Sequence, residues 1–256
     1  METGLHFLMQ KTKNKISKTF VYQFETHFHI ESSTDNITLD FSDSKYLEKS
    51  IDFITDLKID SIEIVHLNSH PSIVPSLYFD DNIKSKYLIT NTLSSKNILT
   101  DTSNDNKLKI VYSISNELNE FINKNKLDHS NKNYFTYLYD FLTEKDKKTK
   151  GLSFFVNLNK KSFDVIIFNG NEFIFFNSFE IKNENEFLYY LFFVLKNYEG
   201  SNENDKIIFL GKFEAFIDYY NIASKYSKIE FIEDNNKQVL HDSPFFSIIN
   251  ENYIRN

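Results

Sequence analysis

Residues 152–179 read LSFFVNLNKKSFDVIIFNGNEFIFFNSF, and this stretch decides the fold. Three runs rich in Phe, Val and Ile, at 152–158, 163–168 and 172–179, have the size and composition of β-strands. Asn169 and Gly170 between the second and third runs predict a type I′ hairpin turn, because Gly adopts positive φ freely and Asn tolerates it. The residues NKKS (159–162) join the first two runs at hairpin length. The sequence therefore predicts an antiparallel three-stranded meander.

The residues after this meander predict two helices that alternate with two strands. Asn183 and Glu186 have the spacing of a capping box, apolar residues follow at helical spacing, and Gly200 stands just past the helix end. This helix is apolar nearly all round, which is typical of burial on two sides, here by the sheet and by a second domain or subunit. Residues 206–211 then read as a strand, 212–226 as an amphipathic helix and 228–233 as a strand. The order β-β-β-α-β-α-β is typical of a ribonuclease-H-like half-domain.

The first half follows the same pattern less clearly. Residues 28–33 and 36–41 predict hairpin strands, 45–59 a helix, 61–67 and 86–92 strands, and 108–114 a strand equivalent to 206–211. Helices are expected at 115–125 and 134–142. We therefore predict an α/β protein with mixed (α+β) sheets, duplicated as two ribonuclease-H-like or actin-like halves at 1–148 and 149–256 with a cleft between them.

Composition limits the function classes. The chain of 256 residues is 41% hydrophobic and 16% aromatic, which excludes wholesale disorder. It contains no cysteine, which excludes disulfides and thiol catalysis and is typical of a reducing cytoplasm. A net charge of -7 disfavours nucleic acid as a partner. No run approaches the roughly 18 apolar residues of a membrane span, and the first residues lack a secretory signal, so we expect a cytoplasmic protein.

Three segments carry a resemblance to a known family. Phe176-Asn177-Ser178-Phe179 leads into a helix that opens Phe-Leu-Tyr-Tyr at 187–190, SIVPSLYFDD begins at residue 72, and VYSISNELNEFI begins at residue 111. These segments resemble an uncharacterised family of Bacteroidetes, number 3822 among the domains of unknown function, with Ile73 in place of its usual leucine. The resemblance covers nearly the whole chain. It implies a duplicated actin-like ATPase fold with no assigned activity.

The resemblance also implies where a nucleotide would bind. Actin-like ATPases hold nucleotide between their halves, on hairpin turns whose glycines admit phosphate and whose carboxylates organise magnesium. Here the second-half turn lacks glycine and has asparagine near the place of the acid. The first-half turn is expected at ESSTDNI (31–37), and one glycine stands where paired glycines normally contact the nucleoside. The candidate cleft residues are Thr34, Asp35, Asn157, Lys160, Lys161, Ser162 and Gly211.

These residues favour a non-catalytic binding or scaffolding module without cofactor, and an ATP- and magnesium-dependent ATPase or phosphotransferase is the alternative. Lys160 and Lys161 also fit a different anion or a solvated hairpin tip. Residues 152–158 contain none of the carboxylates that a two-metal nuclease needs. His27, His29 and Glu25 share a face of a strand, but no fourth metal ligand is visible and no metal site is assigned. The expected partner is an unidentified protein or a second copy of the chain, through aromatic residues of the helix at 187–193.

Overall fold

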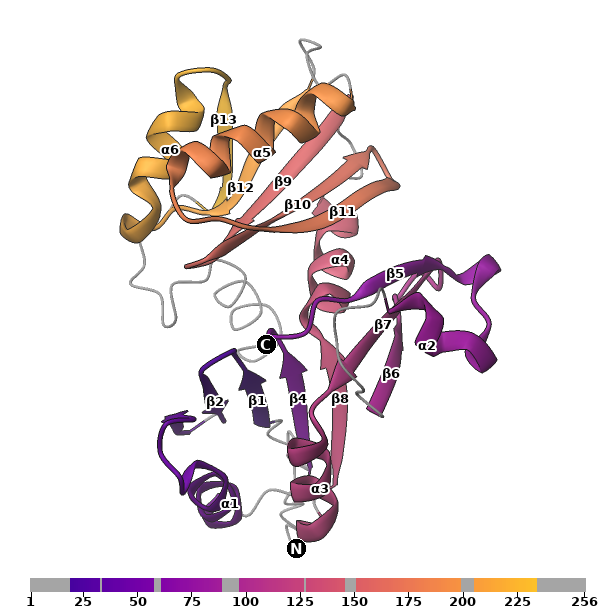
Figure 1. Cartoon of the computed structure of the whole chain (residues 1–256), viewed down its shortest axis with the longest axis vertical. Helices are drawn as coiled ribbons and strands as arrows, with labels where there is room; N and C mark the ends of the chain where they lie inside the picture. Colours follow the sequence, from indigo (N-terminus) through magenta and orange to yellow (C-terminus); the bar gives the residue numbers. More distant parts are fainter. Residues whose placement is uncertain are drawn as a thin grey trace, which may run out of the picture.

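The computed structural model describes residues 19–32, 34–57, 61–88, 97–126, 128–145, 151–198 and 205–233. The strands form two five-stranded sheets and a three-stranded sheet, with strand orders β3-β2-β1-β4-β8, β11-β10-β9-β12-β13 and β5-β7-β6. Figure 1 shows the two larger sheets at opposite ends of the long axis, with helix α4 between them. The predicted mixed α/β class is confirmed. The boundary expected between residues 148 and 149 lies outside the described residues.

The second of the larger sheets follows the predicted order closely. Its elements are β9 (Leu152–Leu158), β10 (Ser162–Asn169), β11 (Glu172–Glu180), α5 (Glu184–Asn197), β12 (Lys206–Gly211), a 3-10 turn η3 (Glu214–Phe216), α6 (Ile217–Ser224) and β13 (Ile229–Glu233). β10 is antiparallel to both β9 and β11, whereas β12 is parallel to β9 and β13. The meander with parallel crossover strands is therefore present as expected.

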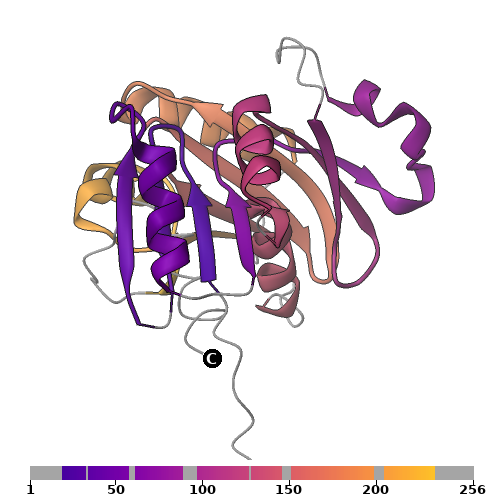
Figure 2. The same cartoon turned by 90° about the horizontal axis from the view of Figure 1, so that it is seen from below.

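The first sheet repeats this connectivity. Its elements are β1 (Thr19–Gln23), β2 (His27–Glu31), β3 (Asn36–Asp40), α1 (Tyr46–Asp56), β4 (Ile62–His66), α3 (Asn116–Asn125) and β8 (His129–Asn133). β2 is antiparallel to β1 and β3, and β4 is parallel to β1 and β8. Figure 2 shows α1 in front of this sheet, with its axis roughly along the strands. Strands β1 and β8 were not predicted, and β1 moves the first hairpin to an earlier turn.

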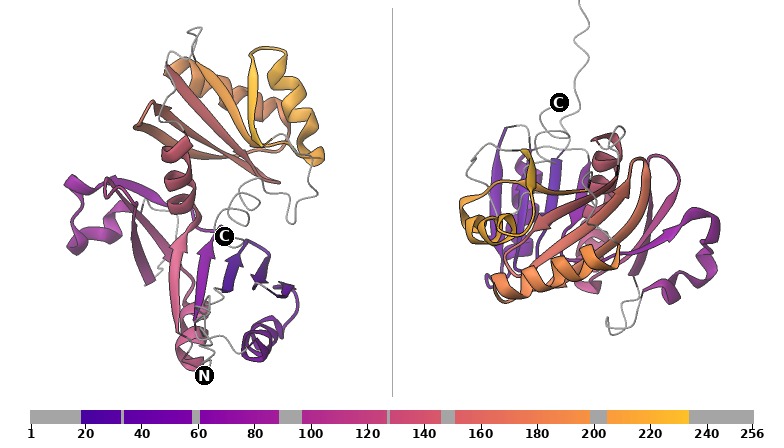
Figure 3. Two further views of the ribbon diagram at one scale, coloured as in Figure 1. Left: turned by 180° about the vertical axis from the view of Figure 1, so that it is seen from behind. Right: turned by 90° about the horizontal axis from the view of Figure 1, so that it is seen from above.

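A three-stranded antiparallel insert separates β4 from α3. It contains β5 (Ser72–Pro75), the 3-10 turns η1 (Ser76–Tyr78) and η2 (Asp81–Ile83), α2 (Lys84–Tyr87), β6 (Asn97–Thr102) and β7 (Leu108–Ile114). The insert projects sideways from the line of the two larger sheets in both panels of Figure 3. Two predictions were wrong here. Lys86 and Tyr87, which begin the expected strand at 86–92, are the last two residues of α2. The equivalent of 206–211 is β4, not 108–114. Residues 89–96 lie outside the described part of the chain.

Helix α4 (Tyr134–Lys145) joins the sheets through the largest core cluster. Its residues from Tyr134 to Leu142 are all buried. The cluster includes Phe20 of β1, Ile110 of β7 and Phe168 of β10. The Phe135 ring lies 4.3 Å from that of Phe176 on β11, centroid to centroid. Helix α4 therefore belongs to one hydrophobic core that includes residues from all three sheets.

One local expectation in the second sheet needs correction, and a second one is met only in part. β10 ends at Asn169 and β11 begins at Glu172, so the central turn residues are Gly170 and Asn171. Only Gly170 of these has positive φ, at 55°, which is the pattern of a type II′ turn rather than type I′. Helix α5 buries Phe187 and Leu191, but Tyr189 is 66% exposed and Phe193 is 52% exposed. Within this chain the side of α5 that carries Tyr189 and Phe193 is exposed, and its expected burial by a second subunit stays a prediction.

Candidate functional site

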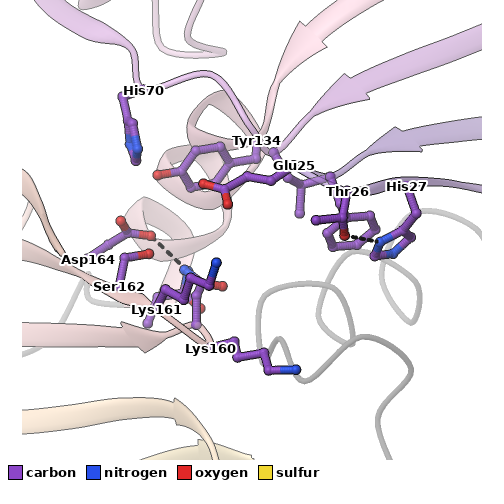
Figure 4. Close-up of a pocket in the computed structure, with 13 residues that line it drawn as sticks. Glu25, Thr26, His27, His70, Tyr134, Lys160, Lys161, Ser162 and Asp164 are labelled. Carbon is purple, nitrogen blue, oxygen red and sulfur yellow. Dashed lines mark hydrogen bonds between the residues drawn. The ribbon is translucent and has the colours of Figure 1, made fainter. Parts of the chain in front are cut away.

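A pocket of about 200 Å³ lies where the first hairpin turns of the two larger sheets meet. The β1–β2 turn contributes Phe24, Glu25 and Thr26, and the β9–β10 turn contributes residues 159–161. The equivalent positions of two duplicated sheets therefore line one cavity. Figure 4 shows Glu25, Tyr134 and Asp164 directed into the same space, with His70 above them.

Asp164 is the buried carboxyl group of this pocket. It lies on β10 opposite Asn157 of β9, is 1% exposed, and its Oδ2 accepts a hydrogen bond of 2.8 Å from Asn157 Nδ2. Burial raises the pKa of Asp164, while the side chains of Asn157 and Ser178, the nearby His70 and the Tyr134 hydroxyl oppose that rise. The net direction is upward, so the neutral form gains relative to a carboxylate in water. The Tyr134 hydroxyl is fully buried, and its pKa is raised by burial and by Asp164.

The amide nitrogen of Asn157 makes a hydrogen bond, whereas its amide oxygen makes none with a described residue. Its side chain is 1% exposed, and Oδ1 accepts no hydrogen bond from any described residue. Asp164 fixes the amide orientation because the carboxyl oxygen needs the NH₂ group as donor. An unsatisfied buried acceptor costs roughly 1–3 kcal/mol. Asn157 thus borders the pocket with a buried, unsatisfied carbonyl oxygen.

The β9–β10 turn supplies the cations at the pocket. Lys160 and Lys161 are both exposed, and Ser162 is partly buried where β10 begins. In Figure 4 the Lys160 side chain extends away from Asp164. The turn is closed by the backbone, because Asn159 N donates to Ser162 O at 2.8 Å. The four predicted residues Asn157, Lys160, Lys161 and Ser162 are thus brought together, and their role in binding stays a prediction.

The other three predicted residues lie elsewhere. Thr34 and Asp35 belong to the β2–β3 turn, where the backbone N–H groups of both donate to Ser32 Oγ at 3.3 and 3.0 Å. Gly211 ends β12, and its carbonyl accepts a 2.9 Å hydrogen bond from the buried Tyr220 hydroxyl. Neither group of residues lines the pocket. The expectation that ESSTDNI is the pocket turn of the first sheet was wrong, because β1 places residues 24–26 there.

The sequence pattern did not place residues of the first sheet in the pocket, although Glu25 and His27 were considered for a metal site. Glu25, Thr26 and His70 belong to turns whose position depends on β1 and β4. Burial and the nearby His29 lower the pKa of His27, and its Nδ1 lies 3.1 Å from Thr26 Oγ1. A usable signal was the apolar run TFVY at 19–22, which precedes a polar three-residue turn and a second strand.

The pocket can be tested for its fit to ATP and magnesium. Neither pocket turn contains glycine, and no residue of either turn has positive φ among those described. Magnesium prefers carboxylate and other oxygen ligands, yet the described residues contain no group of three His, Asp or Glu able to hold a metal ion. The cavity is also smaller than the about 300–1,000 Å³ of ordinary ligand pockets. In these respects the two turns differ from the glycine-containing turns that the actin-like resemblance implies.

Solved structures define the class of the fold. A Bacteroides thetaiotaomicron protein described as having an actin-like ATPase fold and unknown function is 16% identical, with a TM-score of 0.73 over 88% of this chain and 94% of that chain. The PilM-PilN type IV pilus biogenesis complex matches with a TM-score of 0.54 at 6% identity, over 85% and 88% of the two chains. The protein therefore has the actin-like ATPase fold.

The family follows from the sequence. A family model described as Protein of unknown function (DUF3822) matches residues 2–229, and the chain belongs to that family. This confirms the resemblance inferred from the segments at 72, 111 and 176. Among curated proteins, none matches the chain. Within the described residues, no helix is long and apolar enough to cross a membrane.

Proposed function

We propose that this protein is a non-catalytic binding or scaffolding module that uses the actin-like fold without ATP-dependent chemistry. The glycine-free pocket turns at 24–26 and 159–161 carry the proposal. Phosphate needs backbone N–H groups at close range, and a side chain at each turn position obstructs that approach.

The state of Asp164 supports the same conclusion. A carboxylate that organises magnesium must be charged and have free oxygen lone pairs. Asp164 is buried, its pKa is raised, and Oδ2 is engaged by Asn157. It acts better as a structural hydrogen-bonding group than as a metal ligand.

The segment after β12, where an actin-like ATPase would contact the nucleoside, also supports a non-catalytic role. The Tyr220 hydroxyl donates to Gly211 O and accepts from Phe213 N at 3.2 Å. These contacts tie the segment after the strand to α6. In the PilM-PilN complex, a solved structure with this fold forms part of an assembly, which is compatible with a binding role for the fold.

Thermal unfolding with and without Mg-ATP tests the proposal. A ligand at 100 times its Kd stabilises the folded state by about 2.7 kcal/mol, which moves the melting temperature clearly. We expect no shift at millimolar Mg-ATP and no release of phosphate from ATP. ATP hydrolysis that is abolished by Lys160→Ala, and retained in the control Lys182→Ala outside the pocket, contradicts the proposal.

An ATP-dependent ATPase or phosphotransferase is the second candidate. The observation that favours it is the placement of Lys160, Lys161 and Ser162 at the same pocket as Asp164. A melting shift with Mg-ATP that disappears in Lys160→Ala supports this candidate. A shift with inorganic phosphate alone assigns the lysines to a smaller anion.

A further inference from the structure

A groove of about 710 Å³ separates strand β11 from strand β5. One wall is formed by residues 173–178 and Glu180 of β11, and the other by residues 72–74 of β5 with Lys86 and Tyr87 of α2. Each of the two strands is the edge of its own sheet. Figure 1 shows both strands bordering the space beside α4. Two sheet edges therefore face one groove.

Strand β11 is held firmly on both faces. Phe175 contacts Tyr198, which follows the last residue of α5, and Phe179 contacts Tyr190 of α5, with ring centroids 5.2 and 5.1 Å apart. On the opposite face, Phe176 packs on Phe135 of α4. The neighbouring strand β10 is almost wholly buried, whereas every residue of β11 keeps some exposure. The faces are thus covered and the edge is open.

The direction of the β11 backbone groups follows from one hydrogen bond. Ile181 N donates to Lys161 O at 2.9 Å, in register with the antiparallel pairing of β10 and β11. Bonded and non-bonded pairs alternate along such a ladder. The backbone groups of Phe176, Ser178 and Glu180 therefore point away from β10, and all three residues line the groove.

These outward groups have no backbone partner in another segment among the described residues. An edge strand with free N–H and C=O groups is a template for pairing with another chain. The register of β11 shifts at Ile174, which is a β-bulge. The regular part of the edge is therefore Phe175–Glu180.

The facing strand β5 is a poorer template. Ser76 N donates to Lys107 O at 2.8 Å, so the same alternation turns Ile73 and Pro75 outward. Pro75 has no N–H group and occupies the position that a proline tolerates at a sheet edge. Within the groove, β11 is the receptive edge and β5 acts as a wall.

We propose that this groove binds one extended segment of a partner protein, which pairs as an added strand with Phe175–Glu180 of β11. Backbone hydrogen bonds supply affinity in this mode, and alternate side chains enter the flanking surface. Ile73, Val74 and Phe173 make that surface apolar, so the segment has apolar residues at every second position.

The shape of the groove favours a single extended segment as its occupant, rather than a second copy of the whole chain. β5 and α2 stand across the groove from β11, so the edge of another whole sheet meets them before it reaches β11. A lone extended segment has no such obstruction. This inference rests on the proposed binding role and assigns it to a groove next to the pocket at Asp164: His70 borders both, and Ser178 of the groove pairs with Asp164 across β10 and β11.

A pair of substitutions at residue 178 isolates the backbone contribution. Ser178→Pro removes the outward N–H group together with the hydroxyl, and Ser178→Ala removes the hydroxyl alone. Proline is tolerated at edge positions whose N–H faces away from the ladder, so both variants are expected to fold. Their melting curves check this, and Glu180→Pro with Glu180→Ala is the replacement pair at the next outward position.

The probe is a displayed library of random heptapeptides, selected on the full chain. We expect enrichment of peptides with alternating apolar residues. Loss of one backbone hydrogen bond, with an acceptor left unpaired, corresponds to roughly tenfold weaker binding. A synthetic copy of an enriched peptide should therefore bind Ser178→Pro about tenfold more weakly than Ser178→Ala in fluorescence anisotropy.

Amide hydrogen exchange on the unmodified chain gives a readout that needs no variant. The peptide should slow exchange at Phe176, Ser178 and Glu180. Absence of enrichment, equal binding to the two variants, or protection only elsewhere overturns the proposal. Dimers that form without peptide and are lost in Ser178→Pro overturn it in favour of a second copy. None of these results bears on ATP binding, which the Mg-ATP melts test separately.

Discussion

His66 is a buried titratable residue outside the candidate pocket. It is fully buried on β4, with Nδ1 2.8 Å from Gln23 Oε1 and Nε2 2.9 Å from Asn131 Oδ1. Burial lowers the pKa of His66 to about 4, and the hydrogen bond to Asn131 partly opposes this effect. The imidazole is therefore neutral in the folded protein at pH 6.

This shift predicts a loss of stability in mild acid. An unfolded His binds a proton below a pKa of about 6.5, whereas His66 in the folded protein binds one only near pH 4. The free energy of unfolding should fall as the pH falls from 6.5 to 4, by on the order of 3 kcal/mol from this residue. Urea unfolding of the wild type and of His66→Gln measures it, and equal pH slopes for the two proteins would refute the assignment.

Whether a pocket residue could be predicted from the sequence depends on how far along the chain the residues that position it lie. Asn157, Lys160, Lys161 and Ser162 were predictable because a strand pair with a short turn is a local pattern. Glu25 and His70 reach the pocket through pairing of β1 with β4 and through the placement of one sheet against another. No local pattern encodes such an encounter, so half of the pocket was assigned to the wrong turn.

At the scale of a single helix, the N-cap of α5 gives a testable contribution to stability. Asn183 Oδ1 accepts hydrogen bonds of 3.0 Å from the backbone N–H groups of Asn185 and Glu186. Asn183→Ala should lower the free energy of unfolding by about 1 kcal/mol, the usual value of such a cap. Asn185→Ala, two residues later in the first turn of the helix, is the matched control and should change the free energy of unfolding little, because alanine favours helices. Equal losses in denaturant melts would argue against the cap.

Most elements were readable because their periodicity is strong. The expected strands at 152–158 and 206–211 match β9 and β12 residue for residue. Strand β8, with the sequence HSNKN, was not predictable because it lacks apolar residues and, within the described part of the chain, is an edge strand beside β4. The strand at 108–114 was recognised but given the wrong partner, since sequence pattern fixes the type of an element before its place in a sheet.

The shared core predicts the behaviour of the whole molecule. Phe135 is fully buried in a cluster drawn from all three sheets. Phe135→Ala should cost about 3–5 kcal/mol and preserve a single unfolding transition. Phe193→Ala, at a side chain that is 52% exposed, is the control and should change stability much less. Two separate transitions in near- and far-ultraviolet circular dichroism would contradict a common core.

The position of the insert has a consequence for the order in which the chain becomes able to fold. β8 follows β4 only after the whole of residues 67–128, so a ribosome must release residue 133 before the first sheet can acquire its last strand. The second sheet closes within the shorter stretch 152–233. Pairings between distant residues cost more loop-closure entropy and form more slowly. The half that is synthesised first therefore leaves the edge of β4 unpaired for longer than the second half leaves the edge of β12.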